Sequence, residues 1–430
     1  MKNNNAVIIN IDGVIIVFTM LLLTVHDYLF NKMLFHTPFY YLAVWKDLLV
    51  VLFLSYIFIS IYQNSLRAGN ISKGKIHYLI FLFVFLLVAM YGLNSGLIGN
   101  VSNYRYYFLI VYFSAFYAWL ISKNINRNIR YFENGLYLAT AISVAYGYYQ
   151  SFTITKPEDF WYWNHFISLG YEQNIWDAFR DGKPRISSFF TSSLDYSLFL
   201  LTSLSFLLCF TYKSILENKQ LRTIFNLMFL VIVYHSIYIS TVRSALIGSV
   251  GVSFVFFSYF VIRSKLSRLL YSAIIFLSLT LLTFGYIALG FTNELSALGR
   301  LSQWVSFFEQ LKSSPIFGLG IAKIGSKGVY WYDSFWVNYF LSFGVVFGLG
   351  FIYFLIKIYV YAVGELSYRK DPTVITFHFP LYMMTPVFFY LFFFQSFSRT
   401  SSLYIFISLY FLIYLLKRKT SYIYRCEKPG

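Results

Sequence analysis

Five arginines stand beside or between long apolar runs, where a positive charge needs an explanation. They are Arg105, Arg185, Arg243, Arg300 and Arg399. An arginine at the centre of a membrane costs about 2.5–3.5 kcal/mol on insertion scales. Arginine keeps its charge and presents a planar fork of donors that matches phosphate oxygens, so several arginines around one cavity could hold a pyrophosphate. The alternative is that each arginine reaches the membrane interface or pairs with a carboxylate such as Asp195.

Asp333 is the candidate general base. It directly precedes an aromatic stretch, Ser334-Phe335-Trp336, that opens a predicted span. A carboxylate beside an acceptor hydroxyl can take its proton while a sugar carbon is attacked. The alternatives are a solvated loop carboxylate and an N-cap for the following helix. Of the carboxylates inside spans, Asp195 is expected to line a pocket, and Asp12 to pack or to form an ion pair.

Aromatic side chains and one histidine complete the set of polar or stacking groups. The outer connections carry Trp161, Trp163, Trp331 and Tyr332, which could stack on sugar rings or anchor the chain at the membrane interface. Tyr332 is counted among the substrate-binding candidates, together with Trp304, Arg185, Arg105 and Asp195. A lone histidine in a span, His235, is expected to be a hydrogen-bonded residue of the bundle.

The composition identifies the elements that must position these side chains. Of the 430 residues, 58% are hydrophobic, 23% are aromatic and 12% are charged. This balance excludes a water-soluble protein. A helix of about 20 apolar residues crosses the roughly 30 Å of hydrocarbon in a bilayer. We therefore expect an all-α polytopic membrane protein in which residues 1–430 form a single transmembrane domain of about 12 helices, with the first span retained as an anchor.

Apolar runs bounded by polar clusters define the predicted spans. They fall at 7–25, 41–62, 76–93, 106–121, 131–152, 186–212, 224–240, 244–262, 269–291, 336–360, 375–396 and 402–416. Lysines and arginines concentrate in every second connection, which assigns those connections and both termini to the cytoplasm. The two long connections, 153–185 and 292–335, then lie outside, where loops of this length are usually functional.

An amphipathic helix is predicted inside the larger outer loop. Its apolar residues at helical spacing are Leu301, Trp304, Val305, Phe308 and Leu311. We expect this helix to lie in the outer membrane interface with Trp304 at headgroup depth, and to stop at Ser313-Ser314-Pro315. The alternative is a helix that only packs onto the bundle.

Charge, cysteines and missing motifs narrow the function classes. The chain has 34 Lys and Arg against 17 Asp and Glu, a net charge of +17, which indicates topology signals and anionic lipids or substrates rather than nucleic acid. Cys209 and Cys426 lack the spacing of a disulfide, metal or redox motif. No phosphate-binding GxxxxGK[ST] loop, HExxH zinc motif, metal-binding acidic pair or GxSxG elbow occurs. Gly344 and Gly348 are interpreted as a close helix-packing pair.

Residues 185–348 contain an ordered set of short motifs. They are Arg185-Ile186-Ser187-Ser188-Phe189-Phe190, Ser240-Thr241-Val242-Arg243, Arg300-Leu301-Ser302-Gln303-Trp304, Ser314-Pro315-Ile316-Phe317-Gly318-Leu319-Gly320, Asp333 and Gly344. This ordered set resembles the core pattern of the O-antigen ligase and O-antigen polymerase (Wzy) superfamily. That pattern has an arginine-led span opening, a Ser-x-Ser-Arg turn, an arginine four residues before a tryptophan, a Pro-x-x-Gly-x-Gly turn, a polar catalytic position and a glycine in the next span. Thr241, Val242 and Ser188 depart from it.

This resemblance implies a GT-C-type fold and an inverting glycosyltransferase on the outer face of the cytoplasmic (inner) membrane. The implied substrates are undecaprenyl pyrophosphate-linked oligosaccharides, without a metal, nucleotide sugar or other cofactor. The implied partners are membrane lipids and a chain-length regulator protein. The arginines that hold pyrophosphate in the family correspond to Arg185, Arg243 and Arg300.

Three functions stay open at this point. Ligases of the superfamily resemble one another in having a histidine where this chain has Asp333, which favours a polymerase of O-antigen or a related capsular polysaccharide over a ligase. A lipid-linked oligosaccharide flippase would also need cationic residues. Transporters usually show a repeat between halves and discontinuous helices at mid-membrane, and neither is clear in this sequence.

Overall fold

The computed structural model describes residues 10–68, 97–168, 179–180, 182–288, 295–316, 318–319, 332, 334–394 and 401–426. The chain forms α1 (Ile11–Tyr28), η1 (Leu29–Met33), η2 (Pro38–Val44), α2 (Trp45–Ala68), α4 (Leu97–Lys123), α5 (Ile125–Thr153), η4 (Pro157–Asp159), α6 (Trp163–Ser168), β1 (Phe179–Arg180), β2 (Lys183–Pro184), α8 (Ser193–Leu216), α9 (Gln220–Ile239), α10 (Arg243–Val261), α11 (Lys265–Ala288), α12 (Leu295–Leu311), α13 (Phe335–Tyr368), η5 (Val374–His378), α14 (Phe379–Phe394) and α15 (Ser401–Cys426). Nine helical segments in these ranges are long and apolar enough to cross a membrane. The prediction of an all-α polytopic membrane protein is therefore confirmed.

Most predicted spans coincide with helices, and two differ in an informative way. The span predicted at 186–212 starts too early, because α8 begins only at Ser193, after its N-cap Ser192 accepts a hydrogen bond from Leu194 N. Residues 186–190 are apolar but form a buried, non-helical segment. The span predicted at 41–62 starts inside the 3-10 helix η2 and continues as α2. The span predicted at 76–93 lies outside the described residues.

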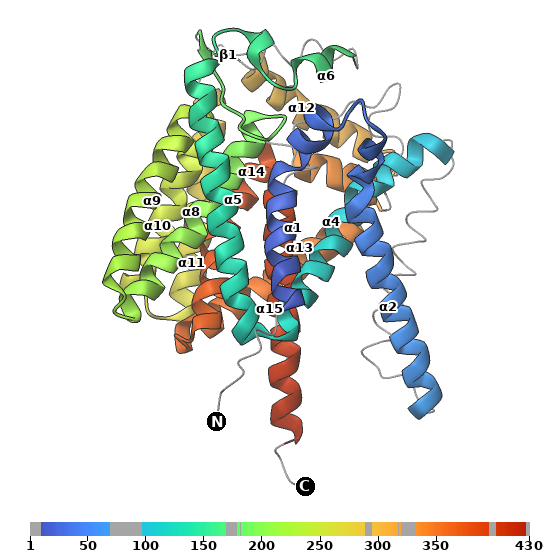
Figure 1. Ribbon diagram of the computed structural model, residues 1–430, viewed down its shortest axis with the longest axis vertical. Helices are drawn as coiled ribbons and strands as arrows, with labels where there is room; N and C mark the ends of the chain where they lie inside the picture. Colours follow the sequence, from blue (N-terminus) through green and yellow to red (C-terminus); the bar gives the residue numbers. More distant parts are fainter. Residues whose placement is uncertain are drawn as a thin grey trace, which may run out of the picture.

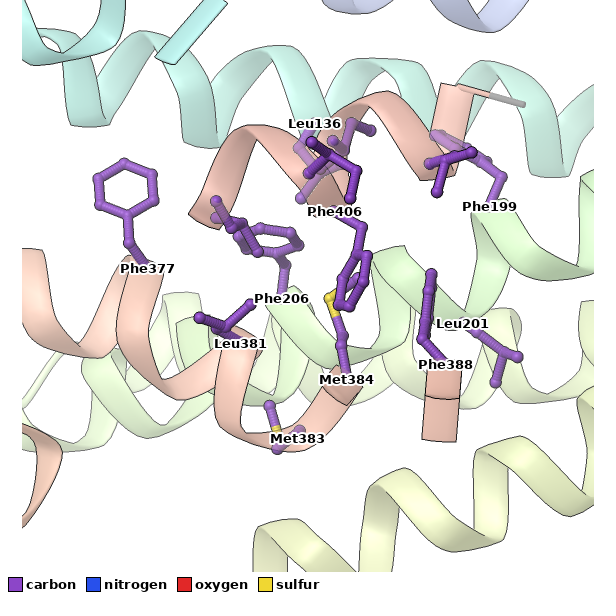
Figure 2. Packing of buried hydrophobic residues seen from close by; sticks show 14 of the residues in the cluster. Leu136, Phe199, Leu201, Phe206, Phe377, Leu381, Met383, Met384, Phe388 and Phe406 are labelled. Atoms are coloured by element: carbon purple, nitrogen blue, oxygen red, sulfur yellow. The ribbon is translucent and has the colours of Figure 1, made fainter. Parts of the chain in front are cut away.

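Two helices, α8 and α14, form the centre of the bundle. In the most apolar stretch of each helix, 94% of the residues are buried. Figure 2 shows Phe199, Leu201 and Phe206 of α8 close to Met384 and Phe388 of α14. The hydroxyls of α8 that face this apolar core bond back to the helix four residues earlier, as Thr202 does to Leu198 O at 3.0 Å, so they are buried without loss of hydrogen bonds.

A tight connection joins α8 to α9. Asn218 adopts a left-handed conformation with φ of 54°. Its N–H donates to Ile215 O at 3.1 Å, and the next N–H, of Lys219, donates to Ser214 O at 2.9 Å. This is the Schellman arrangement, for which asparagine is one of the few suitable residues besides glycine. It makes α8 and α9 antiparallel neighbours.

The start of α1 and the end of α15 lie at the same end of the bundle, opposite α12 (Figure 1). Asp12, in the first turn of α1, pairs with Lys123, the last residue of α4, at 3.1 Å. The ammonium of Lys123 also lies 4.2 Å from the Trp119 ring centroid. The expectation that Asp12 forms an ion pair is confirmed, and the pair fixes α1 against the α4–α5 connection.

Candidate functional site

Arg185 follows the β1–β2 hairpin and precedes a segment that is bound firmly to α5. Ser188 has a φ of 53°, and its N–H donates to Gln150 Oε1 at 2.7 Å. Gln150 Nε2 returns a bond to Ser188 O at 3.1 Å, and Trp161 Nε1 donates to the same oxygen at 2.9 Å. Ser188 Oγ donates to Ser143 O at 2.7 Å. The half-buried side chain of Arg185 is therefore carried by a rigid support.

The surroundings of Arg185 are aromatic and largely dry. Burial raises the pKa of Tyr162 well above its usual value, although a hydrogen bond to Ser187 and the charge of Arg185 act in the opposite direction. Tyr162 therefore stays a neutral phenol. Trp161, one of the predicted sugar-stacking residues, is buried and packs edge-on against Tyr28 at 5.3 Å between ring centroids, so its indole belongs to the support of this loop.

Arg243 begins α10 directly after a tight turn, as predicted for 241–243. Thr241 has a φ of 56°, and its N–H donates to Tyr238 O at 3.1 Å. The buried Ser240 Oγ donates to Ile237 O at 2.6 Å and accepts from Ser197 Oγ of α8 at 2.9 Å. This last bond attaches the turn to the first part of α8, and the Arg243 side chain is exposed beside it.

The segments that carry Arg185 and Arg243 are both attached to the start of α8. The Arg185 segment leads into Ser192, the N-cap of this helix, and the turn before Arg243 is bonded to the helix through Ser240 Oγ and Ser197 Oγ. Asp195, a predicted pocket residue, lies in this turn and is half-buried. His235 lies about one helical turn before the end of α9. Its Nδ1 is hydrogen-bonded to Tyr148 Oη at 2.5 Å, as expected for a residue of the helix bundle.

The predicted amphipathic helix is α12, which starts six residues before Leu301 and packs on the bundle at the end that carries β1 and α6 (Figure 1). Trp304 lies against Phe393 of α14, with ring centroids 5.4 Å apart. Phe307, absent from the predicted apolar face, is only 5% exposed, whereas Val305 and Phe308 are 63% and 58% exposed. α12 therefore buries Phe307 and contacts α14 through Trp304, while Val305 and Phe308 of the predicted apolar face are exposed. The location of this face in the membrane interface stays a prediction.

Tyr332 joins α12 to the start of α13. Its hydroxyl lies 2.9 Å from Ser306 Oγ and accepts from Gln310 Nε2 at 2.6 Å. Its N–H donates to Asn338 Oδ1 at 3.1 Å, and Asn338 Nδ2 donates to its carbonyl oxygen at 2.6 Å. Because the ring is buried and the hydroxyl is engaged by protein groups, Tyr332 positions its neighbours, and its binding of substrate stays a prediction.

Asp333 lies outside the described residues, between two anchored neighbours. Tyr332 is held as described, and Ser334 Oγ donates to Phe392 O at 2.9 Å. Ser334 is also the N-cap of α13 and accepts from Val337 N at 3.4 Å. The alternative that Asp333 caps this helix is therefore wrong, because the following residue does so.

The turn around Gly318 packs into a break in α13. Gly344 has a φ of 75° inside the helix, and Gly318 has the same value in the turn. Leu319 N donates to Leu341 O at 2.7 Å, and Val345 N donates to Pro315 O at 2.9 Å. The interpretation of Gly344 and Gly348 as a helix-packing pair was wrong: at Gly344 a loop, not a second helix, approaches the backbone.

The remaining predicted arginines are placed only by their backbone or not at all. Arg105 belongs to α4 and Arg300 to the first part of α12. Their side chains, and the whole of Arg399, lie outside the described residues. The structure thus brings Arg185, Arg243 and Asp195 to one helix end, and places α12 at that same end of the bundle (Figure 1).

A buried lysine was missed by the sequence interpretation. Lys46, at the start of α2, is buried, and its ammonium lies 5.3 Å from the ring centroid of Tyr404, in the first turn of α15. The adjacent Trp45 Nε1 donates to His26 Nδ1 at 3.1 Å. The available signal was the pair Lys46-Asp47 near the start of the predicted span 41–62.

Comparison of this chain with protein-family models, with curated proteins and with solved structures finds no match.

Proposed function

We propose that this protein is a polysaccharide polymerase of the inner membrane that transfers a growing glycan from undecaprenyl pyrophosphate onto a lipid-linked repeat unit. The observation that supports the proposal is that the segments of Arg185 and Arg243 are each held by hydrogen bonds and both adjoin the start of α8. When arginines are held in this way, little free energy is lost to reorganisation on binding an anion. The planar guanidinium groups also match the geometry of diphosphate oxygens.

The proposed reaction is a direct displacement at the anomeric carbon. A hydroxyl oxygen of the acceptor repeat unit forms the new glycosidic bond, while the bond between the anomeric carbon and the pyrophosphate oxygen breaks. The acceptor proton passes to Asp333, and undecaprenyl pyrophosphate leaves with the bonding electron pair. Arg243 and Arg300, assisted by Arg185, stabilise the charge that develops on the diphosphate.

A reconstituted assay tests this function directly. Purified protein in vesicles receives a synthetic polyprenyl-pyrophosphate repeat unit, without nucleotide or added metal, and the products are sized on a gel. A ladder of lipid-linked oligomers supports polymerisation. Transfer of the glycan to added lipid A core, without a ladder, would instead identify a ligase.

A lipid flippase remains the second candidate because α13 is discontinuous at Gly344, a feature not clear in the sequence and common in transporters. In transporters the freed backbone groups of such breaks bind the cargo. Here Leu341 O and Val345 N already bond to Leu319 N and Pro315 O, which favours an anchoring role for the break. Movement of the labelled substrate between leaflets, with no change in its size, would establish the flippase.

Gln150 is predicted to be a positioning residue for Arg185. Gln150→Met keeps the side-chain length but removes both bonds to the Ser188 backbone, which leaves a buried N–H unsatisfied at a cost of about 1–3 kcal/mol. We expect inserted protein whose polymerisation rate is about tenfold lower, with a raised KM for the lipid-linked donor. Kinetics of ladder formation measure both quantities.

Ser151→Ala is the matched control for Gln150→Met. Ser151 is the next residue of α5, and its hydroxyl donates only to Tyr148 O of the same helix, at 2.7 Å. Its rate and KM should stay near the wild-type values. Equal kinetics for both variants would show that the support does not position Arg185.

A further inference from the structure

A buried carboxylate connects four elements at the end of the bundle opposite α12. Glu133 of α5 is only 2% exposed. Its Oε1 accepts from Lys213 Nζ of α8 at 2.6 Å and from Thr376 Oγ1 of η5 at 3.2 Å. Its Oε2 accepts from Arg222 Nη2 of α9 at 2.8 Å. The sequence interpretation treated Lys213 and Arg222 as topology signals and did not single out Glu133.

Glu133, Lys213 and Arg222 line a polar cavity of about 810 Å³, within the usual size range of ligand pockets. Every carboxylate in its lining is already in an ion pair: Glu217 pairs with Lys219 at 2.7 Å, and Asp371 with Arg369 at 3.1 Å. The lining carries five cationic side chains, Arg130, Lys213, Lys219, Arg222 and Arg369, against three acidic ones. The cavity therefore keeps an excess of two positive charges.

Arg130 is the lining residue best suited to meet a ligand. It is exposed, stands one turn before Glu133 in α5, and has no ion-pair partner among the residues that the structure describes. Its guanidinium fork is thus not occupied by a carboxylate of the cavity. A phosphate group that entered the cavity could accept hydrogen bonds from Arg130 without first breaking an ion pair.

The mouth of the cavity adjoins an apolar, lipid-facing surface of α9. Phe225 lines the cavity and is 58% exposed, and Leu221, one turn earlier, is 85% exposed. The end of the bundle in question is the one that the basic connections assign to the cytoplasm. Basic pockets between helices on this side of a membrane bind anionic headgroups.

We propose that this cavity, formed by α5, α8, α9 and the α13–η5 connection, binds a phosphate-bearing anion, with Arg130 as its direct contact and Arg369, which pairs with Glu365 and Asp371, as a second cation of the site. The ligand supplies the negative charge that offsets the two excess cations and ties the α13–η5 connection to α5. Its source is either the headgroup of an anionic phospholipid, whose chains lie along α9, or soluble phosphate. The site lies at the opposite end of the bundle from the proposed transferase site and is independent of it.

The test measures the thermal unfolding midpoint of the full chain in neutral detergent micelles. The lipid arm adds phosphatidylglycerol or cardiolipin, with phosphatidylcholine as the uncharged comparison, and the soluble arm adds inorganic phosphate or pyrophosphate. A ligand that binds only the folded protein raises the midpoint in a concentration-dependent way. We expect Arg130→Gln to shift the half-maximal concentration upward by about tenfold, and Arg130→Gln with Arg369→Gln to remove the response.

Arg263→Gln is the matched control, since Arg263 is an exposed arginine at the same end of the bundle that does not line the cavity. A response to anionic lipid that survives in Arg263→Gln but weakens in Arg130→Gln supports a headgroup site. The same pattern with inorganic phosphate or pyrophosphate supports a soluble ligand. A response lost equally in both single variants, or no response of the wild type to any anion, overturns the proposal.

Discussion

Arg300→Ala or Arg243→Ala should yield normally inserted protein that builds no polymer. Each substitution removes a fixed cation from the place where diphosphate charge develops, and the loss of one such donor typically slows the reaction by about 10²–10³-fold. The Arg243 side chain is exposed at the start of α10, so we expect the bundle to stay folded when it is removed. The vesicle assay with a synthetic polyprenyl-pyrophosphate repeat unit measures the effect.

Two comparisons make this prediction specific. Arg399→Ala should be nearly neutral, because Arg399 lies outside the motifs that carry the resemblance. Arg243→Lys should recover only part of the rate because an ammonium cannot form the bidentate contact. Normal chain growth in both Arg300→Ala and Arg243→Ala would refute the pyrophosphate clamp, even if the protein still proved to be a transferase.

Gly344→Ala and Gly318→Ala should be the most destabilising single methyl additions in the described part of the chain. A Cβ at Gly344 would lie 2.2 Å from Ile316 O, and one at Gly318 would lie 2.5 Å from Gly344 N. Backbone atoms cannot move aside as a flexible side chain can. A left-handed backbone costs alanine about 1–2 kcal/mol, and overpacking adds about 1–3 kcal/mol. Together these terms predict a loss of about 2–5 kcal/mol, measured as a lower thermal unfolding midpoint in detergent.

Gly350→Ala provides the control in the same helix. Gly350 is exposed and has no heavy atom within 4 Å of an added Cβ, so alanine should be neutral or should stabilise the helix by up to about 1 kcal/mol. If Gly344→Ala unfolds no earlier than Gly350→Ala, the loop at Pro315–Leu319 is not docked in the break of α13 as described.

The positions of most membrane spans were predictable from the sequence, because the hydropathy of a segment depends only on the residues within that segment. The errors occur where burial does not require a helix. Ile186 and Phe190 are as apolar as any span residue, but hydrogen bonds from Gln150 hold their segment non-helical. Hydropathy also cannot distinguish a lipid-facing side chain from one in the protein interior, and the buried Phe307 was therefore not among the residues predicted for the apolar face of α12.

The site was predictable only in part, for a different physical reason. The turn before Arg243 could be recognised from a short polar stretch between two apolar runs. The support of Arg185 could not, since it depends on Gln150 and Ser143, which lie far away in the sequence. The same holds for Glu133, whose partners come from α8, α9 and η5. Long-range pairing of polar groups leaves no periodic signal in a single sequence.

The central position of α8 and α14 also constrains how the protein is made. Translation delivers α8 in the middle of the chain and α14 close to its end, yet side chains of both helices belong to the same hydrophobic core (Figure 2). During synthesis, the side of α8 that later meets α14 faces lipid or the insertion machinery. Its hydroxyls tolerate this, because they bond within their own helix. The hydrophobic core is therefore completed only after residues 374–426 have been synthesised. A chain truncated before residue 374 would insert into the membrane without the helices that complete this core.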